Sequence, residues 1–191
     1  SYDIQAESYN KSIGRFDNMI YWHDAVRSGD PDNYEGRTAA FYWRNIFSDI
    51  IPHFTRGRFE QPPNNMLNYV YAILRAVIAR SLVGAGLFPL FGVHHRNKYN
   101  AYPLADDIME PYRPFADSIV RDLTEKYFTK AWFDEGFKLT PEIKKELLQL
   151  PVIDVMIDGK RSPLLIATQR TAASLFHVFA GNSRKVLYPE M

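Results

Sequence analysis

The sequence predicts a single all-α domain of about six helices, and three observations support that fold class. Apolar residues recur at helical spacing through most of the chain, without the alternation that strands would show. Clusters of glycine, proline and other turn formers separate these stretches. With 191 residues and 46% hydrophobic content, the chain is long enough for one sizeable core and short for two ordinary domains.

The first two helices are predicted over residues 4–27 and 35–49. In the first, Ile13, Phe16 and Met19 approximate a helical stripe, which stops at a cluster of turn formers from residue 28 onward. The second has small and aromatic residues spaced for burial of one face.

The third helix is predicted over residues 64–84 and belongs to the most apolar span of the chain. Arg75 and Arg80 interrupt that span, and Gly84, Gly86 and Pro89 break it, so it is predicted to be a buried core helix and not a membrane span. Both arginines need partners, because an unpaired buried charge is costly. Carboxylates and DNA phosphates are both open as those partners.

A fourth helical region begins near Ala105 and continues as an amphipathic helix over residues 115–130. Pro111 cannot donate a backbone hydrogen bond to the carbonyl group of Asp107, which predicts a kink or a late helix start there. The helical pattern breaks again near Gly136.

Two more helices and a short strand complete the predicted fold. Thr140, Pro141 and Glu142 form a strong helix start, with the threonine as N-cap, and the helix runs to about residue 150. Residues 152–157 alternate apolar and acidic side chains and predict a short strand that ends at an Asp-Gly turn. The last helix spans about residues 163–180.

The densest group of chemically functional side chains lies in residues 91–114. It contains two histidines, three carboxylates and several cations, directly after the most apolar segment. If the chain is helical from Ala105 onward, Asp107 and Glu110 lie at i and i+3 and point to one face, which could hold a hard divalent cation. An imidazole from the preceding loop would add a nitrogen ligand that suits manganese or magnesium. A solvated acidic helix face is the common alternative for such a pair.

Composition sets only broad limits on function. A net charge of +1 neither demands nor excludes a nucleic-acid partner, so any basic surface has to be local. The absence of cysteine removes disulfides and thiolate metal sites and fits a reducing compartment, which favours a cytoplasmic location. The first residues show no secretory signal.

Three strings together resemble one family, the spacer integrase of CRISPR adaptation, CRISPR-associated protein one, in the versions of type II systems. They are GVHH at 92–95 followed by LADDIMEPYRP at 104–114, EGRTAA at 35–40, and PPNNMLNYVY at 62–71. In the third string Val70 stands where the family usually has glycine, which suggests slightly wider helix packing. The resemblance extends from about Asn33 to the end of the chain.

The resemblance implies a catalytic site that binds Mg²⁺ or Mn²⁺. Its implied catalytic metal ligands are Glu35, His95 and Glu110, with Asp107 as a further ligand beside them. The choice of His95 over His94 rests on the family pattern. Without the resemblance, Glu35 would be assigned to the positive end of a helix dipole.

The function that the resemblance implies is that of a metal-dependent DNA endonuclease and integrase in a prokaryotic cytoplasm. It joins the 3′-hydroxyl ends of a protospacer to the CRISPR repeat by transesterification. The implied partners are these two DNAs, CRISPR-associated protein two and a second copy of the full-length protein, with no membrane. Family members carry an amino-terminal β-rich domain that this sequence lacks, so residues 1–191 are expected to be an isolated carboxy-terminal catalytic domain with weak or no activity alone.

Basic side chains near the implied ligands are expected to bind DNA phosphates. They are Arg96, Lys98 and Arg113, with Arg56 and Arg58 as a second group. Arg113 could instead pair with a neighbouring carboxylate such as Asp117. Two other functions stay open, namely a metal-dependent DNA hydrolase without integration and a non-catalytic helical scaffold.

Overall fold

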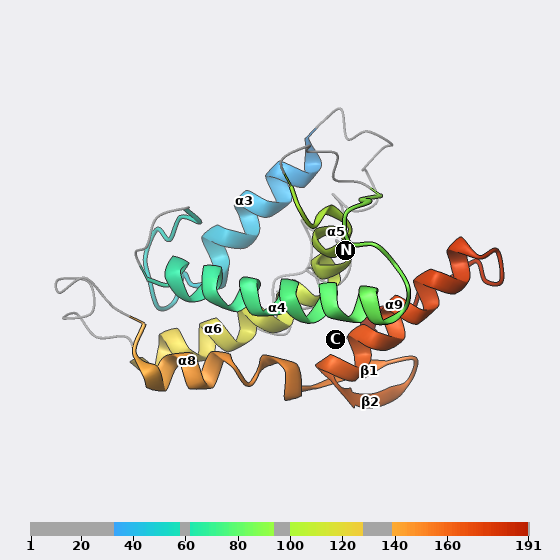
Figure 1. Cartoon of the computed structure of the whole chain (residues 1–191). Helices are drawn as coiled ribbons and strands as arrows, with labels where there is room; N and C mark the ends of the chain where they lie inside the picture. The colour runs from blue at the N-terminus through green and yellow to red at the C-terminus, as the bar shows by residue number, and fades with distance from the viewer. Residues whose placement is uncertain (1–32, 58–61, 94–99, 128–138, 191) are drawn as a thin grey trace.

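The computed structural model describes residues 33–57, 62–93, 100–127 and 139–190 (Figure 1). In chain order, its elements are α3 (Tyr34–Ile46), α4 (Asn64–Gly84), α5 (Pro103–Met109), the 3₁₀ turn η1 (Glu110–Tyr112), α6 (Arg113–Tyr127), α8 (Pro141–Leu147), the 3₁₀ turn η2 (Leu150–Val152), β1 (Asp154–Ile157), β2 (Lys160–Pro163), α9 (Leu164–Phe179) and β3 (Pro189–Glu190). The predicted helix over residues 4–27 lies outside the described part. The mainly helical fold class is confirmed.

Helix α4 is the centre of the core, as the predicted helix over residues 64–84 requires. Leu67, Val70, Leu74 and Ile78 follow one another at three- and four-residue spacing and are almost completely buried. The elements that contact α4 most are α9, α6 and α5. In Figure 1, α4 runs across the middle of the molecule, with α6 and α8 below it and α3 above.

Of the described helices, α4 alone is long and apolar enough to cross a membrane. Its packing against three other helices and its fully buried Leu67 and Leu74 are those of a core helix. The prediction of a buried helix, rather than a membrane span, agrees with this packing.

Pro111 divides the helical region that follows Ala105 into two helices. Because proline has no backbone N–H, the α-helical ladder of α5 ends at Met109, and the chain makes one 3₁₀ turn before α6 starts at Arg113. Of the two predicted outcomes, a kink or a late helix start, the late start is wrong because α5 already begins at Pro103, and the interruption at Pro111 corresponds to the kink. The turn brings Glu110 and Arg113 to i and i+3, where their side chains can meet.

The carboxy-terminal part of the chain forms a small antiparallel sheet with strand order β2-β1-β3. Asp158 and Gly159 connect β1 to β2, and both have positive φ angles, 53° and 66°, as a two-residue hairpin turn requires. The predicted strand corresponds to β1. The all-α prediction missed β2 and β3, because β2 is an exposed, charged edge strand and β3 has only two residues.

We expect Gly159→Ala to lower the free energy of unfolding by about 1 kcal/mol, since an alanine at positive φ is strained. Gly84→Ala is the matched control, because it lies at the end of α4 with nothing within 4 Å of the added Cβ atom. There the same change should stabilise the protein by about 0.5–1 kcal/mol through helix propensity. Urea unfolding of both variants measures the two effects, and equal signs would contradict the assigned turn.

Candidate functional site

The structure describes part of the predicted site. Of the residues predicted for the site, the structure describes the side chains of Asp107, Glu110, Arg113 and Arg56. Those outside the described residues are His95, Arg96, Lys98, Arg58 and the side chain of Glu35. Among the described residues, no three histidine or acidic side chains come together as a metal-binding group. The convergence of Glu35, His95 and Glu110 therefore stays a prediction.

Asp107 connects α5 to the preceding loop, and its charge acts on the carboxy-terminal tail. Its Oδ2 atom accepts a hydrogen bond from the backbone N–H of Val93 at 2.7 Å, which anchors the chain one residue before the two histidines. Burial raises the pKa of Tyr188, and the Asp107 carboxylate raises it further, so the tail passes close to this acid. No sequence pattern indicated that Tyr188 would lie here.

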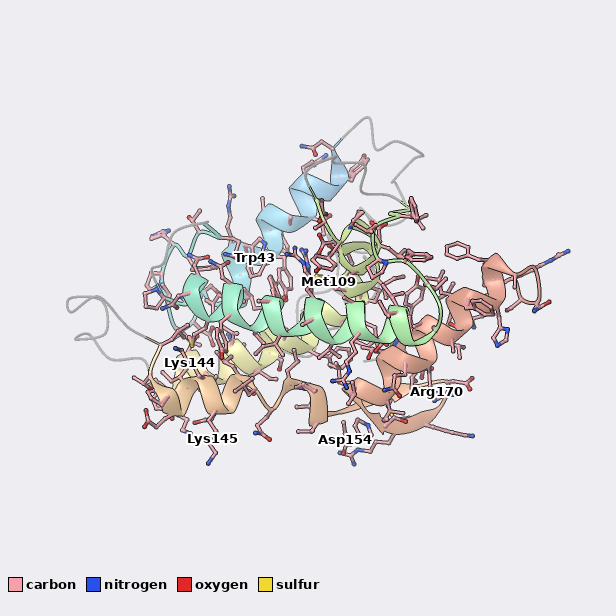
Figure 2. The ribbon with its side chains drawn as sticks, in the orientation of Figure 1. Trp43, Met109, Lys144, Lys145, Asp154 and Arg170 are labelled. Atoms are coloured by element: carbon pink, nitrogen blue, oxygen red, sulfur yellow. The ribbon has the colours of Figure 1, made fainter. Side chains whose placement is uncertain are left out.

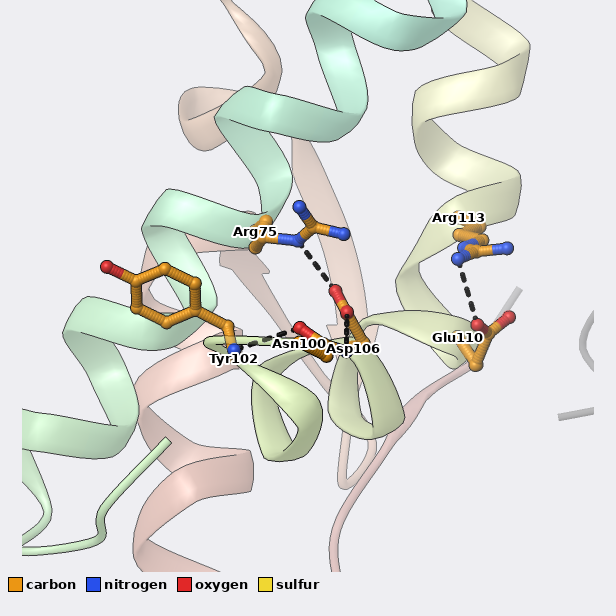
Figure 3. A network of polar contacts seen from close by, with 6 residues as sticks. All are labelled: Arg75, Asn100, Tyr102, Asp106, Glu110 and Arg113. Atoms are coloured by element: carbon orange, nitrogen blue, oxygen red, sulfur yellow. Dashed lines mark hydrogen bonds and ion pairs between the residues drawn. The ribbon is translucent and has the colours of Figure 1, made fainter. Parts of the chain in front are cut away.

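Glu110 is paired with Arg113 across the 3₁₀ turn. The Nη2 atom of Arg113 lies 3.0 Å from Oε1 of Glu110 (Figure 3). The exposed fraction is 31% for the Arg113 side chain and 25% for that of Glu110. The alternative partner that the sequence allowed, Asp117, interacts with Arg113 only through its charge. The ion pair therefore orients the carboxylate that the resemblance assigns to the metal.

Asp117 of α6 is almost completely buried. Its Oδ2 atom accepts a hydrogen bond from the hydroxyl of Tyr42 at 2.7 Å, and its Oδ1 atom accepts one from Tyr71 at 2.5 Å. Burial raises the pKa of Asp117 to about 6, although the two hydroxyls and the charges of Arg113 and Arg56 act in the opposite direction. Three helices thus converge on one carboxylate.

Arg56 is held in place by two asparagines of α4. Its Nη1 atom donates to Oδ1 of Asn64 at 3.0 Å, and its Nη2 atom donates to Oδ1 of Asn68 at 2.7 Å. The guanidinium lies 5.7 Å from the ring centroids of both Trp43 and Tyr71, within cation–π range. The two asparagines of the resembled string therefore position a cation.

Arg113 shares the ring of Tyr71 with Arg56. Its guanidinium carbon lies 5.1 Å from the ring centroid. The Nε atom of Arg113 is buried without a hydrogen-bond partner in the described structure. Tyr71, which donates a hydrogen bond to Asp117, is thus in contact with two arginines of the site.

Asp106 has a structural role. Its Oδ1 atom accepts from Nε of Arg75 at 2.6 Å, and its Oδ2 atom accepts from Nδ2 of Asn100 at 2.7 Å (Figure 3). The carboxylate is buried and both oxygens are occupied. Of the three acids in the string, Asp107 and Glu110 are therefore better placed than Asp106 to bind a ligand.

The backbone of Glu35 lies in the first turn of α3. Position 35 is on the same face of the helix as Thr38 and Tyr42, which are buried, and it lies two turns, about 10 Å, before Tyr42. A Cβ atom at Gly36 would come within 2.6 Å of the Asn33 side chain, so the glycine of the EGRTAA string leaves room for that side chain. The face of α3 that carries position 35 is therefore the one that packs towards Asp117.

The described groups suit phosphate chemistry. Two carboxylates one helical turn apart supply the oxygen ligands that Mg²⁺ and Mn²⁺ prefer. Arg56 and Arg113 both lie over the ring of Tyr71 and can neutralise phosphate oxygens. Figure 2 shows Trp43 and Met109 near the middle of the molecule on the α3–α5 side, whereas Lys144, Lys145, Asp154 and Arg170 lie on the opposite side of α4.

Comparison with known proteins identifies the family. The family described as CRISPR associated protein Cas1 matches residues 11–150. A CRISPR-associated endonuclease Cas1 of Neisseria meningitidis is 36% identical over 167 residues, which are 87% of this chain and 52% of that protein. One from Francisella tularensis subsp. novicida is 33% identical over 166 residues, 83% of this chain and 51% of that protein. The chain thus spans about half the length of these relatives.

Solved structures show the same fold. A Cas1 protein from Thermotoga maritima superposes with a TM-score of 0.74 at 17% identity, covering 95% of this chain and 64% of that one. A casposase bound to its integration product superposes with a TM-score of 0.72 at 20% identity, covering 97% and 58%. At these identities the likeness concerns the fold alone.

We expect Asp117→Asn to remove a pH dependence of stability. The pKa of Asp117 is raised from 3.8 to about 6, so the folded state binds a proton more tightly than the unfolded chain does. The protonated acid therefore favours folding below pH 4, and this contribution is lost as the pH rises to about 6. The loss is on the order of 3 kcal/mol, since one pKa unit corresponds to about 1.4 kcal/mol.

The measurement is urea unfolding at several pH values, read as the difference between the wild type and Asp117→Asn. Glu125→Gln is the matched control, because Glu125 is an exposed acid on the same helix. A constant difference between the wild type and Asp117→Asn across this pH range would mean that Asp117 is not the group that titrates.

Proposed function

The chain belongs to the Cas1 family of CRISPR-associated proteins, and we propose that it is the catalytic domain of a divalent-metal-dependent DNA endonuclease and integrase. The 3′-hydroxyl at a protospacer end attacks a phosphodiester of the CRISPR repeat. A new 3′-oxygen–phosphorus bond forms, the original one breaks, and the leaving repeat strand takes a proton on its own 3′-oxygen. With water in place of the hydroxyl, the same attack cleaves DNA.

The observation that carries this proposal is the presentation of Asp107 and Glu110 at the junction of α5 and η1. They lie one turn apart, and Arg113 holds Glu110 by an ion pair of 3.0 Å. Hard oxygen donors of this kind fit Mg²⁺ or Mn²⁺. The proposed ligands are Glu110 with Glu35 and His95, and Asp107 beside them.

A divalent ion held by these residues would supply Lewis-acid activation of the phosphate and would lower the pKa of the attacking hydroxyl or water. This chain's own residues do the positioning. Arg113 fixes the Glu110 carboxylate, and Asp107 anchors the loop that leads to His95. Arg56, held by Asn64 and Asn68, presents a fixed cation to the DNA backbone.

The proposed partners are protospacer DNA, the CRISPR repeat, CRISPR-associated protein two and a second copy of the full-length protein, in the cytoplasm of a prokaryote. This chain matches only about half the length of its relatives. Integration needs two active sites held at a set distance across one protospacer. We therefore expect a parent protein of the relatives' length, and not residues 1–191 alone, to be the efficient integrase.

Glu110→Gln is expected to reduce strand transfer by at least about a hundredfold, because it removes a charged ligand while keeping the size of the side chain. The assay joins a labelled donor DNA with 3′-hydroxyl ends to repeat DNA, using the full-length parent with CRISPR-associated protein two and Mn²⁺. Glu125→Gln on α6 should retain wild-type activity.

The same assay separates integration from hydrolysis. A donor with 3′-deoxy ends should abolish joining while leaving cleavage of branched DNA intact. If the wild type cleaves DNA but never joins the 3′-hydroxyl donor, the protein is a hydrolase. If Glu110→Gln joins DNA as fast as the wild type, Glu110 is not a metal ligand.

Arg56→Ala should weaken DNA binding for all sequences and lower the slope of log K against log salt by about one. The reason is the loss of one phosphate contact, which carries no base information. Arg44→Ala is the control, because Arg44 is an exposed cation in the last turn of α3. An unchanged slope for Arg56→Ala would place the phosphate contacts on other residues.

A further inference from the structure

Arg75 is a cation of the site that the proposed mechanism leaves without a task. Its Nε atom donates to Oδ1 of Asp106 at 2.6 Å, and Asp106 is buried. Within the described part of the chain, Arg75 makes no other hydrogen bond or ion pair, and its side chain is 48% exposed. A buried acid therefore holds an arginine whose outer end faces solvent.

The geometry of the guanidinium decides what that outer end can bind. Arginine has five N–H donors in one plane, and only Nε is used by Asp106. The two Nη groups remain, and together they form an edge that matches two oxygens of a phosphate. Because Asp106 already fixes the side chain, less rotamer freedom is lost when a ligand binds.

The position of Arg75 on α4 links it to the other two arginines. Asn68, Tyr71 and Arg75 lie at i, i+3 and i+7 and therefore share one face of the helix. Asn68 holds Arg56, and the ring of Tyr71 contacts both Arg56 and Arg113. Figure 3 shows Arg75 and Arg113 above the same α5–η1 segment, each bonded to one of its acids.

The three arginines thus follow α4 over a distance that suits a nucleic-acid strand. From Asn68 to Arg75 the helix rises about 10 Å. A strand of duplex DNA carries one charge per about 3.4 Å of helix axis, so this rise corresponds to about three nucleotides. Glu110 is close to these arginines, because it forms an ion pair with Arg113.

We propose that Arg75 binds a backbone phosphate of the DNA strand that enters the active site, at one end of a track formed by Arg56, Arg113 and Arg75 along α4. The proposal rests on the proposed function in so far as DNA is the ligand. The chemistry recognised is the phosphodiester, so the contact has no base preference. Arg80 takes no part, because it lies five residues further on, about 140° around the helix.

The test is DNA binding by the full-length protein without divalent metal, measured at several salt concentrations with a labelled duplex of mixed sequence. Arg75→Gln keeps a donor for Asp106 but removes the charge. It should weaken binding about tenfold and lower the salt slope by about one. Arg80→Gln, an exposed cation on the same helix, should bind as the wild type does. Equal slopes for Arg75→Gln, Arg80→Gln and the wild type would overturn the proposal.

Asp106→Asn separates a direct contact from a purely structural role. It removes the acid but keeps the cation, so the salt slope should stay that of the wild type even if affinity falls. If instead Asp106→Asn loses the same unit of slope as Arg75→Gln, Arg75 acts only through Asp106 and the proposal is wrong. Thermal unfolding of each variant confirms that it is folded under the binding conditions.

Strand transfer in Mn²⁺ is measured separately, so that the two proposals can fail independently. If the wild type does not join DNA ends but Arg75→Gln lowers the slope, the phosphate contact stands and the proposed reaction falls. If the wild type joins DNA ends and Arg75→Gln leaves both slope and affinity unchanged, the reaction stands and the phosphate contact falls.

Discussion

The burial of the Asp117 carboxylate is the constraint on which the geometry of the site depends. A carboxylate away from water is costly unless hydrogen bonds and opposite charges compensate it. Here Tyr42 of α3 and Tyr71 of α4 both donate to an acid of α6, so one buried group fixes three helices relative to one another. The ring of Tyr71 then has Arg56 and Arg113 against it, and Arg113 in turn holds Glu110.

The charges of the site are arranged in pairs of acid and arginine. Glu110 pairs with Arg113, and Asp106 pairs with Arg75, with distances of 3.0 and 2.6 Å. Each pair holds its acid in a defined orientation. The net charge of +1 says little about this region, because any phosphate contact depends on local neutralisation and not on total charge.

Pro111 gives the site its local shape. The 3₁₀ turn that it forces between α5 and α6 sets Glu110 and Arg113 one turn apart at the junction of two helices. Asp107, in the last turn of α5, accepts a hydrogen bond from the backbone N–H of Val93. Its charge also raises the pKa of Tyr188 in the tail. The preceding loop is therefore hydrogen-bonded to this junction, and the charge of Asp107 acts on the tail.

The sequence by itself determined the elements whose pattern is local. Apolar spacing determined α4, Thr140 determined the start of α8, and the missing N–H of Pro111 determined the break before α6. The resemblance to a family identified the proposed ligands, which spacing alone left open. Only the tertiary structure decided the pairings, namely Arg113 with Glu110 in place of Asp117, Asn64 and Asn68 with Arg56, and Arg75 with Asp106. The physical reason is distance along the chain: Tyr42 and Asp117 are separated by 75 residues, and no periodicity along the sequence records a contact between different helices.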